Sequence, residues 1–277
     1  MKILISADLE GVNGVVSPKD IIPGEAGYET ARVLMTEEVN SVVCGALAAG
    51  ADQVIVCDAH EDAQNLRFDL LDERAWLIRG ETRNDSMVHG IDATFDGLIL
   101  LGYHAMFGTQ KAVLDHSYDQ RLIRSLEVNG VPYGEAGVNG LLAAEHGVPL
   151  LMATGDDALE REMKSFDENV DVAVVKYAQG RYCARCLPQR ESTGLLFDMA
   201  VKAVKDAPSK VCKPVPEQIT MGVTFQQTCM ADGAMRVKGV RRNGAMSVLY
   251  PCTSMQEYME MRQIIFQAAA EFYDSRF

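Results

Sequence analysis

Short apolar runs alternate with amphipathic segments through the first 160 residues of the chain. Residues 2–9 form an almost wholly apolar run followed by turn residues, as expected for a strand buried on both faces. Residues 26–49 repeat apolar side chains at helical spacing and end at Gly50. Further short apolar runs lie at 54–57, 76–78, 98–101 and 149–152. This alternation predicts an α/β fold with a largely parallel sheet flanked by helices.

A hairpin signal interrupts this pattern at residues 126–133. Asn129-Gly130 separates two short alternating runs, and an Asn-Gly pair between such runs favours a two-residue hairpin turn. The predicted hairpin leads into Gly134-Glu135 and then into a predicted helix through residues 141–143.

The pattern changes beyond residue 160. Strands are predicted at 172–175 and 219–225, and helices at 192–206 and 254–273, the second opened by a Ser254…Glu257 capping box. Pro214-Val215-Pro216 is a candidate seam before the last part. We therefore expect one unit of residues 1–277, subdivided into an α/β core at 1–160 and a smaller α+β portion at 161–277.

Charge and hydropathy narrow the classes of partner. A formal net charge of -13 over 277 residues argues against a nucleic-acid partner, which needs a basic surface. No run of about 18 apolar residues is present, so no membrane-spanning helix is expected. Asp8 and Glu10 interrupt the N-terminal apolar run too early for a signal peptide, so we expect a cytoplasmic protein with reduced thiols. The single Cys183-x-x-Cys186 pair is interpreted as ordinary thiols.

Carboxylates and imidazoles follow three of the predicted strands. Asp8 and Glu10 end the first strand, His60 follows the run at 54–57, and His104 follows the run at 98–101. The carboxyl ends of parallel strands share one edge of a sheet, where open α/β folds bind ligands. These side chains therefore outline a metal site. The alternative is structural: each histidine could be a hydrogen-bonded loop residue, and the acidic pair could cap a turn.

The other polar candidates carry weaker signals. His116, in Asp115-His116-Ser117, fits either a surface loop or a catalytic role, whereas His89 and His146 are interpreted as structural. Gly155-Asp156-Asp157 follows a predicted strand, and helix capping is the preferred interpretation there. The motifs of serine hydrolases, helical zinc proteases, P-loops and dinucleotide-binding folds are absent from the sequence.

Taken together, these residues resemble the D-aminopeptidase family of dinuclear zinc enzymes. The resemblance covers residues 1–160 in order and spacing and continues more faintly to the C-terminus. The stretches that carry it are Asp8-Leu9-Glu10-Gly11, Met35-Thr36-Glu37-Glu38-Val39-Asn40, Asp58-Ala59-His60, Leu101-Gly102-Tyr103-His104-Ala105, His116-Ser117, Gly134-Glu135-Ala136-Gly137-Val138-Asn139 and Ala153-Thr154-Gly155-Asp156-Asp157.

The resemblance implies a role for each candidate residue. Asp8 would bridge two zinc ions. Glu10 and His60 would complete one metal site, and His104 and Glu135 the other. His116 matches the family's active-site histidine that is not a ligand. Nitrogen and carboxylate ligands without thiolate suit Zn²⁺, although Mn²⁺ or Co²⁺ would also fit.

The function implied by the resemblance is that of an aminopeptidase. Two zinc ions would activate a water for attack on the amide carbonyl of a short peptide or aminoacyl amide and release its N-terminal residue, such as D-Ala. The family also implies a homo-oligomer, a decameric ring with an internal chamber. Two alternatives stay open: a different metal-dependent amide or phosphoester hydrolase, and a non-catalytic peptide-binding protein that keeps its metals structurally.

Overall fold

The structure is a computed structural model that describes residues 1–81 and 83–273. Its strands are β1 (Lys2–Ala7), β2 (Gln53–Asp58), β3 (Ala75–Ile78), β4 (Gly97–Leu101), β5 (Ile123–Val128), β6 (Val131–Pro132), β7 (Leu150–Asp156), β8 (Asp171–Gly180), β9 (Cys183–Cys186), β10 (Ile219–Phe225), β11 (Arg241–Arg242) and β12 (Ser247–Cys252). Its helices are α1 (Pro18–Ile21), α2 (Tyr28–Ala48), α3 (Glu135–Glu145), α4 (Asp157–Phe166), α5 (Gln189–Asp206), α6 (Thr228–Ala234) and α7 (Met255–Ala270), with short 3₁₀ turns at Ser86–Val88 and Ala207–Ser209.

The larger sheet has the strand order β3-β2-β1-β4-β7-β8-β9, and all of its neighbours pair in parallel except β8 and β9. The central strand β1 lies between β2 and β4, with Ala7 opposite both Asp58 and Leu101. The carboxyl ends of these three strands therefore meet at one edge. The predicted α/β fold with a largely parallel sheet is confirmed.

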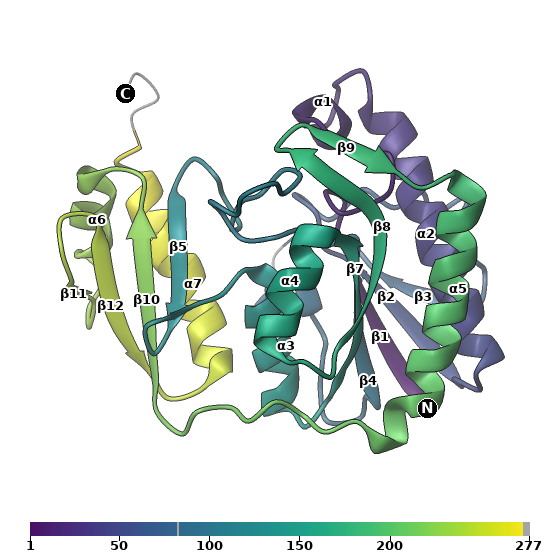
Figure 1. The fold of residues 1–277 in the computed structure, drawn as a ribbon. Helices are drawn as coiled ribbons and strands as arrows, with labels where there is room; N and C mark the ends of the chain where they lie inside the picture. Colours follow the sequence, from purple (N-terminus) through teal and green to yellow (C-terminus); the bar gives the residue numbers. More distant parts are fainter. Residues whose placement is uncertain (82, 274–277) are drawn as a thin grey trace.

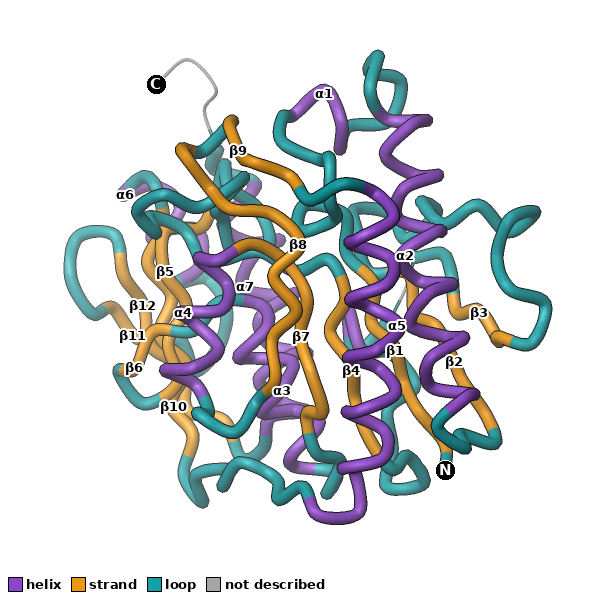
Figure 2. Tube along the Cα trace, turned by 45° about the vertical axis from the view of Figure 1, so that its right-hand side comes forward, coloured by secondary structure: helices purple, strands orange, loops and turns teal. Residues whose placement is uncertain are grey.

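Each face of the larger sheet contributes to a separate hydrophobic core. Along β1, Ile3 and Ile5 belong to the core that includes residues of α2 and α5, whereas Leu4 belongs to the other core, which includes residues of α3 and α7. Figure 1 shows α2 and α5 on one side of this sheet and α3 and α4 on the other, between the two sheets. Figure 2 shows α2 and α5 running in front of the strands. Burial of β1 on both faces explains why its sequence is a continuous apolar run.

The smaller sheet is antiparallel, with the order β11-β12-β10-β5-β6, and α6 and α7 pack against it. The predicted hairpin joins β5 to β6. Asn129 and Gly130 have φ values of 54° and 78°, the left-handed conformation that a type I′ turn requires at both positions. The smaller α+β portion expected after the α/β core is thus present, and this hairpin contributes to it.

Both sheets draw strands from either side of residue 160. The hairpin at 123–132 joins the smaller sheet, and β8, β9 and α5 belong to the larger sheet and its cover. The division at residue 160 remains a prediction about folding units, although each sheet contains strands from both sides of this residue. At α7, Ser254 caps the helix by accepting a hydrogen bond from the Glu257 amide, but the Glu257 carboxylate binds Thr253 and not Ser254, so only half of the capping box forms.

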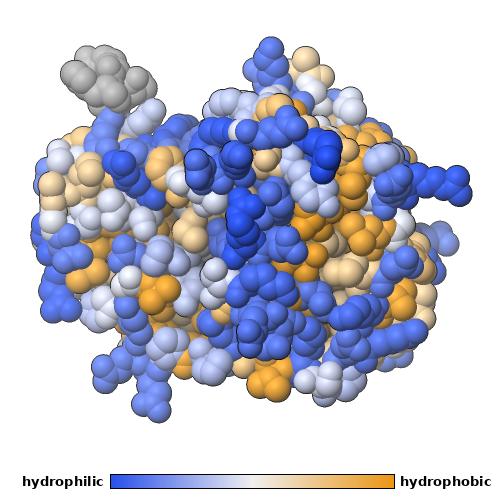
Figure 3. All heavy atoms as spheres, in the orientation of Figure 1, coloured by the Kyte–Doolittle hydropathy of each residue, from blue (hydrophilic) through white to orange (hydrophobic). Residues whose placement is uncertain are grey.

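The surface is predominantly polar on the face shown in Figure 3, with hydrophobic side chains gathered over the region between β8 and α5. The exposed large hydrophobic residues include Tyr177 on β8 and Phe197 on α5. Among the described residues, no helix combines the length and apolar character that crossing a bilayer requires.

Candidate metal centre

Five predicted ligands converge at the carboxyl edge of the larger sheet. Asp8 and Glu10 follow β1, His60 follows β2, His104 follows β4, and Glu135 is the first residue of α3. All five are between 2% and 4% exposed. Polar side chains buried to this degree must be hydrogen-bonded, paired or metal-bound. The strand-end argument from sequence therefore placed Asp8, Glu10, His60 and His104 together, as the structure does, whereas Glu135 was assigned by the family resemblance.

Two glycines let the loops after β1 and β4 touch. The Gly11 amide donates a 2.6 Å hydrogen bond to the Gly102 carbonyl. A Cβ atom on Gly11 would lie 1.9 Å from the Tyr103 carbonyl oxygen, and one on Gly102, where φ is +67°, would lie 2.3 Å from the Asp8 carbonyl oxygen. A side chain at either position would separate the loops, so the glycines set the distance between Asp8 and His104.

His60 presents one ring nitrogen to two carboxylates. Its Nε2 lies 2.9 Å from the Ile21 carbonyl oxygen, so we place the ring proton there, donating to that oxygen. Its Nδ1 then faces Glu10 Oε2 at 3.0 Å and Asp8 Oδ1 at 3.4 Å. Burial opposes a charge on this ring, but the two carboxylates outweigh it and raise the pKa of His60 well above its usual value. A metal cation shared by Nδ1 and the carboxylates would satisfy the same atoms without a proton.

His104 is arranged in a similar way on the other side of Asp8. Its Nδ1 lies 3.0 Å from the Ala105 carbonyl, which leaves Nε2 facing Glu135 Oε1 at 3.4 Å and Asp8 Oδ2 at 3.6 Å. Both His104 Nε2 and Asp8 Oδ2 are buried without a hydrogen-bond partner among the described residues. An unsatisfied buried polar group costs about 1–3 kcal/mol. A cation bound between these two atoms removes that cost, so the donor set fits a metal.

The carboxylates respond to each other's charge. Burial, reinforced by the neighbouring Glu10, raises the pKa of Asp8 to about 7. The pKa of Glu10 lies well below its usual value because, against the opposing effect of burial, His60 stabilises its charged form. Carboxylates this close cannot all remain ionised without cations between them.

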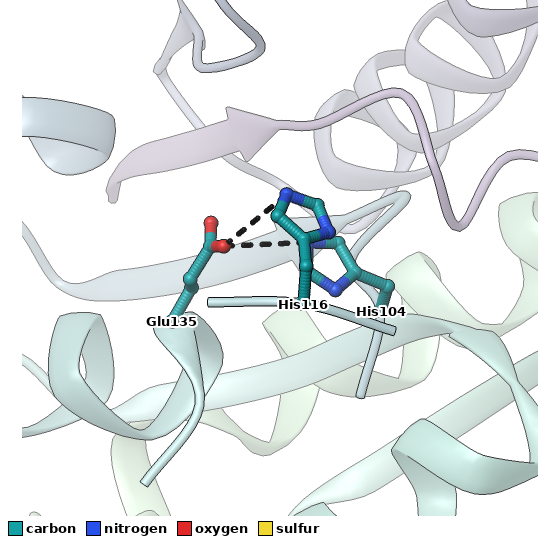
Figure 4. Close-up of side chains that lie close together, drawn as sticks. All are labelled: His104, His116 and Glu135. Atoms are coloured by element: carbon teal, nitrogen blue, oxygen red, sulfur yellow. Dashed lines mark ion pairs between the residues drawn. The ribbon is translucent and has the colours of Figure 1, made fainter. Parts of the chain in front are cut away.

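His116 lies against this cluster (Figure 4). Its ring stacks on that of His104, with centroids 4.1 Å apart and planes 9° apart. Its Nδ1 lies 2.8 Å from the Leu114 carbonyl, and its Nε2 lies 3.7 Å from Glu135 Oε1 and 3.9 Å from Glu10 Oε1. Burial, followed by the charge of His104, lowers the pKa of His116. His116 thus offers a lone pair at Nε2 inside the site.

The ligand atoms form two overlapping groups that could hold a metal. One group is Asp8, Glu10 and His104, and the other is His104, His116 and Glu135; the ligand atoms of each lie within 4.8 Å of one another. The division of ligands between two metals, and the role of His116 beside them, remain predictions from the resemblance.

The sequence alone did not reveal two supports of the site. Lys176, in β8, is fully buried, and its Nζ donates to the carbonyls of Glu10, Val12 and Val15 at 2.5, 2.8 and 2.6 Å. Burial lowers its pKa to about 8. Tyr118 donates its backbone N–H to Glu135 Oε1 at 2.6 Å. The available signal for Lys176 was a single lysine within an apolar strand, which needs buried acceptors.

The helix-capping interpretation of Gly155-Asp156-Asp157 is confirmed. The Asp156 side chain accepts hydrogen bonds from the Ala158 and Leu159 amides at the start of α4, and its second oxygen accepts one from Val113. The Asp156 carboxylate therefore caps α4 and binds the loop before His116, which leaves it a structural role.

Comparison with known proteins now decides the family. A model of the D-aminopeptidase family matches residues 1–264. The chain belongs to the D-aminopeptidase family. It is 31% identical over 270 residues to the D-aminopeptidase of Bacillus subtilis (strain 168), covering 97% of this chain and 98% of that protein.

A solved structure agrees with this assignment. This D-aminopeptidase family chain superposes on the zinc-dependent D-aminopeptidase DppA from Bacillus subtilis, described as a self-compartmentalizing protease, with a TM-score of 0.94 and 31% sequence identity over 98% of each chain. The predicted resemblance, the fold and the enzyme class, a peptidase, are thereby confirmed.

Proposed function

We propose that this D-aminopeptidase family member is a dinuclear zinc aminopeptidase that removes the N-terminal residue, such as D-Ala, from short peptides and aminoacyl amides. The observation that carries the proposal is the pair of buried, unpartnered atoms Asp8 Oδ2 and His104 Nε2, 3.6 Å apart at the centre of the site. A cation shared by two such atoms would satisfy both. The zinc dependence of the similar DppA structure supports zinc as that cation.

The five buried ligands divide between two ions in this proposal. Asp8 offers one oxygen toward His60 and the other toward His104, which suits a bridging carboxylate. Glu10 and His60 would complete the first site, and His104 and Glu135 the second. The donors are nitrogen and oxygen atoms without thiolate, which suits zinc, while manganese or cobalt would also be accepted.

The residues around the ions then have separable tasks. Zinc at these ligands supplies Lewis acidity, which polarises a carbonyl oxygen and lowers the pKa of water in the site. His116 accepts or returns a proton at Nε2, because its Nδ1 is occupied by the Leu114 carbonyl. Stacking on His104 holds the His116 ring in place, so the His116 Nε2 stays directed toward the ligand cluster.

The shape of the site suits the amino end of a short peptide. The ligands line a cavity of about 200 Å³, in which Ser86 and Met87 lie beside the carboxylates. An outer pocket of about 340 Å³ shares Glu10, Glu61, His116 and Tyr118 with this cavity and adds apolar side chains, including Ile21. The inner cavity would take a small first residue with its charged amine, and the outer pocket the rest of the peptide.

Phosphoester hydrolysis is disfavoured by the lining of the same cavity. No lysine or arginine is among the described residues that line the 200 Å³ cavity. Arg121, in the outer pocket, is already paired with Asp119 at 2.7 Å. A phosphate would therefore meet carboxylates without a compensating cation beyond the metals.

The proposal extends to assembly and location. The description of DppA as self-compartmentalizing supports a homo-oligomer, and the family resemblance supports a decameric ring. We also propose a cytoplasmic location, in keeping with the reduced state expected for the cysteines, all seven of which are free. Light scattering of the purified protein tests the ring, because a monomeric mass would refute it.

Metal analysis and a substrate panel test the activity. We expect close to two zinc ions per chain and release of the first residue from D-Ala peptides or D-Ala amides. The panel pairs each D-aminoacyl substrate with its L-enantiomer, and N-acetylated peptides serve as controls that must not be cleaved. A zinc-supplemented protein that binds no metal and cleaves none of these substrates would refute the proposal.

A further inference from the structure

We infer that Arg262 and Tyr118 form a positioning pair that holds the proposed metal ligand Glu135 in place from the neighbouring helix α7. Arg262 belongs to α7, which packs on the smaller sheet, whereas Glu135 begins α3. The inference rests on the proposed metal site and adds to it two residues outside the ligand set.

Arg262 is a buried cation held by aromatic rings. The residue is 4% exposed, and it makes no hydrogen bond or ion pair with a described residue. Its guanidinium carbon lies 3.7 Å from the centroid of the Tyr118 ring and 5.5 Å from that of Phe266. A desolvated guanidinium without a carboxylate partner depends on such cation–π contacts. The contact therefore restrains the position of both the Arg262 guanidinium and the Tyr118 ring.

Tyr118 connects this anchor to the metal site through its backbone. Its φ is +59°, a left-handed conformation that is unfavourable for a residue with a bulky side chain. In this conformation its N–H donates to Glu135 Oε1 at 2.6 Å. The same oxygen faces His104 Nε2 at 3.4 Å and His116 Nε2 at 3.7 Å. The strained backbone thus directs a donor at the oxygen proposed to bind metal.

The ring, and not the hydroxyl, makes the anchoring contact. The Tyr118 hydroxyl oxygen is buried and has no hydrogen-bond partner among the described residues. The ring faces Arg262 and meets Phe266 edge-on, with centroids 6.3 Å apart. Removal of the hydroxyl should therefore leave the anchor intact, whereas removal of the cation or the ring should release it.

A role for Arg262 in binding substrate fits the structure less well. Arg262 is not among the residues that line the 200 Å³ metal cavity, whereas Tyr118 is. Arg262 therefore affects the metal site through Tyr118, which lies between Arg262 and the cavity. Partners of this kind orient metal ligands, and their loss typically costs about 10- to 100-fold in metal affinity.

Zinc affinity of the demetallated protein, measured by competition with a chromophoric chelator, tests the inference. We expect Arg262→Met to weaken one of the two zinc sites by about 10- to 100-fold and to leave the other within about two-fold. Arg262→Lys, which keeps a cation over the ring, should restore most of the affinity, and Tyr118→Phe should retain it. The matched control is Arg236→Met, because Arg236 also lies over an aromatic ring, that of Phe272 at 5.5 Å, but is exposed and paired with Glu271.

The readout separates positioning from general stability. Thermal unfolding of the metal-free variants reports loss of packing, which would weaken both sites together. If Arg262→Met does not fold, Tyr118→Met removes the ring from the other end of the contact while keeping the backbone donor. Equal weakening of both zinc sites, or unchanged affinity in a variant that folds, would overturn this inference alone. A wild-type protein that binds no zinc would overturn the proposed metal site and this inference with it.

Discussion

The imidazole rings of His104 and His116 stack with their centroids 4.1 Å apart and their planes 9° apart. Two stacked imidazoles cannot both become positively charged imidazolium rings without repulsion, and His116 is the ring whose pKa is lowered, by burial first and then by His104. This arrangement leaves His116 neutral beside a cluster of ligands. It suits His116 for proton transfer more than for structural pairing with a carboxylate.

His116→Gln should reduce kcat by about 10²- to 10⁴-fold, the usual contribution of a proton-transfer group, while retaining both zinc ions. Steady-state kinetics and metal analysis of the same preparation check this. His146→Gln is the control, because His146 lies at the C-cap of α3 and outside the ligand cluster. Loss of one zinc ion in His116→Gln would instead make His116 a ligand, as its place in the group with His104 and Glu135 would permit.

Asp8→Asn should lose both zinc ions, whereas His60→Ala should lose only one. The reason is that Asp8 faces His60 with Oδ1 and His104 with Oδ2, whereas the carboxylate atoms that His60 faces are Asp8 Oδ1 and Glu10 Oε2. Metal content after dialysis against a weak chelator measures the difference. Equal losses in the two variants would show that Asp8 does not bridge.

Lys176→Met should lower the free energy of unfolding of the metal-free protein by about 3 kcal/mol or more. The substitution leaves the carbonyls of Glu10, Val12 and Val15 without their buried donor, and each unsatisfied group costs about 1–3 kcal/mol. Urea unfolding measures the change. Lys205→Met, on the exposed face of α5, is the matched control and should be neutral within about 0.5 kcal/mol.

Glu38→Gln should stabilise the protein increasingly as the pH rises. Burial raises the pKa of Glu38 to about 7, so between pH 4.5 and 7 the folded state holds a proton that the unfolded chain releases. Stability from this group is therefore present below pH 4.5 and lost as the pH rises through 7. The advantage of Gln should grow by about 2–3 kcal/mol from pH 4.5 to pH 8. Urea unfolding of both proteins at the two pH values would refute this if the difference were constant.

The strand ends of the larger sheet were predictable because they depend on local pattern. Continuous apolar runs mark buried parallel strands, and the residues after such runs must meet at one edge. Asp8, His60 and His104 follow directly from that rule. The confirmed hairpin at Asn129-Gly130 is local in the same way.

The rest of the site depends on contacts between distant segments. Glu135 begins a helix after the hairpin, and no local signal tells which sheet that hairpin joins, so only the family resemblance assigned it. The burial of Arg262 and the left-handed φ of Tyr118 arise where α7 meets the loop after His116. A charged residue on a helix normally indicates a solvent-facing position, and tertiary packing reversed that expectation here.

The order in which the strands enter the two sheets bears on how the protein is made. The hairpin at 123–132 lies midway along the chain, but β5 pairs with β10, with Val128 opposite Met221. During synthesis, β5 must wait for residues 219–225 to leave the ribosome, and α7 emerges later still. Helix α3, which carries Glu135, is therefore synthesised before β10, β11 and β12, the strands that complete the smaller sheet. The contact between Arg262 and the Tyr118 ring can form only after α7 has been made, so the surroundings of Glu135 are complete only in the finished chain.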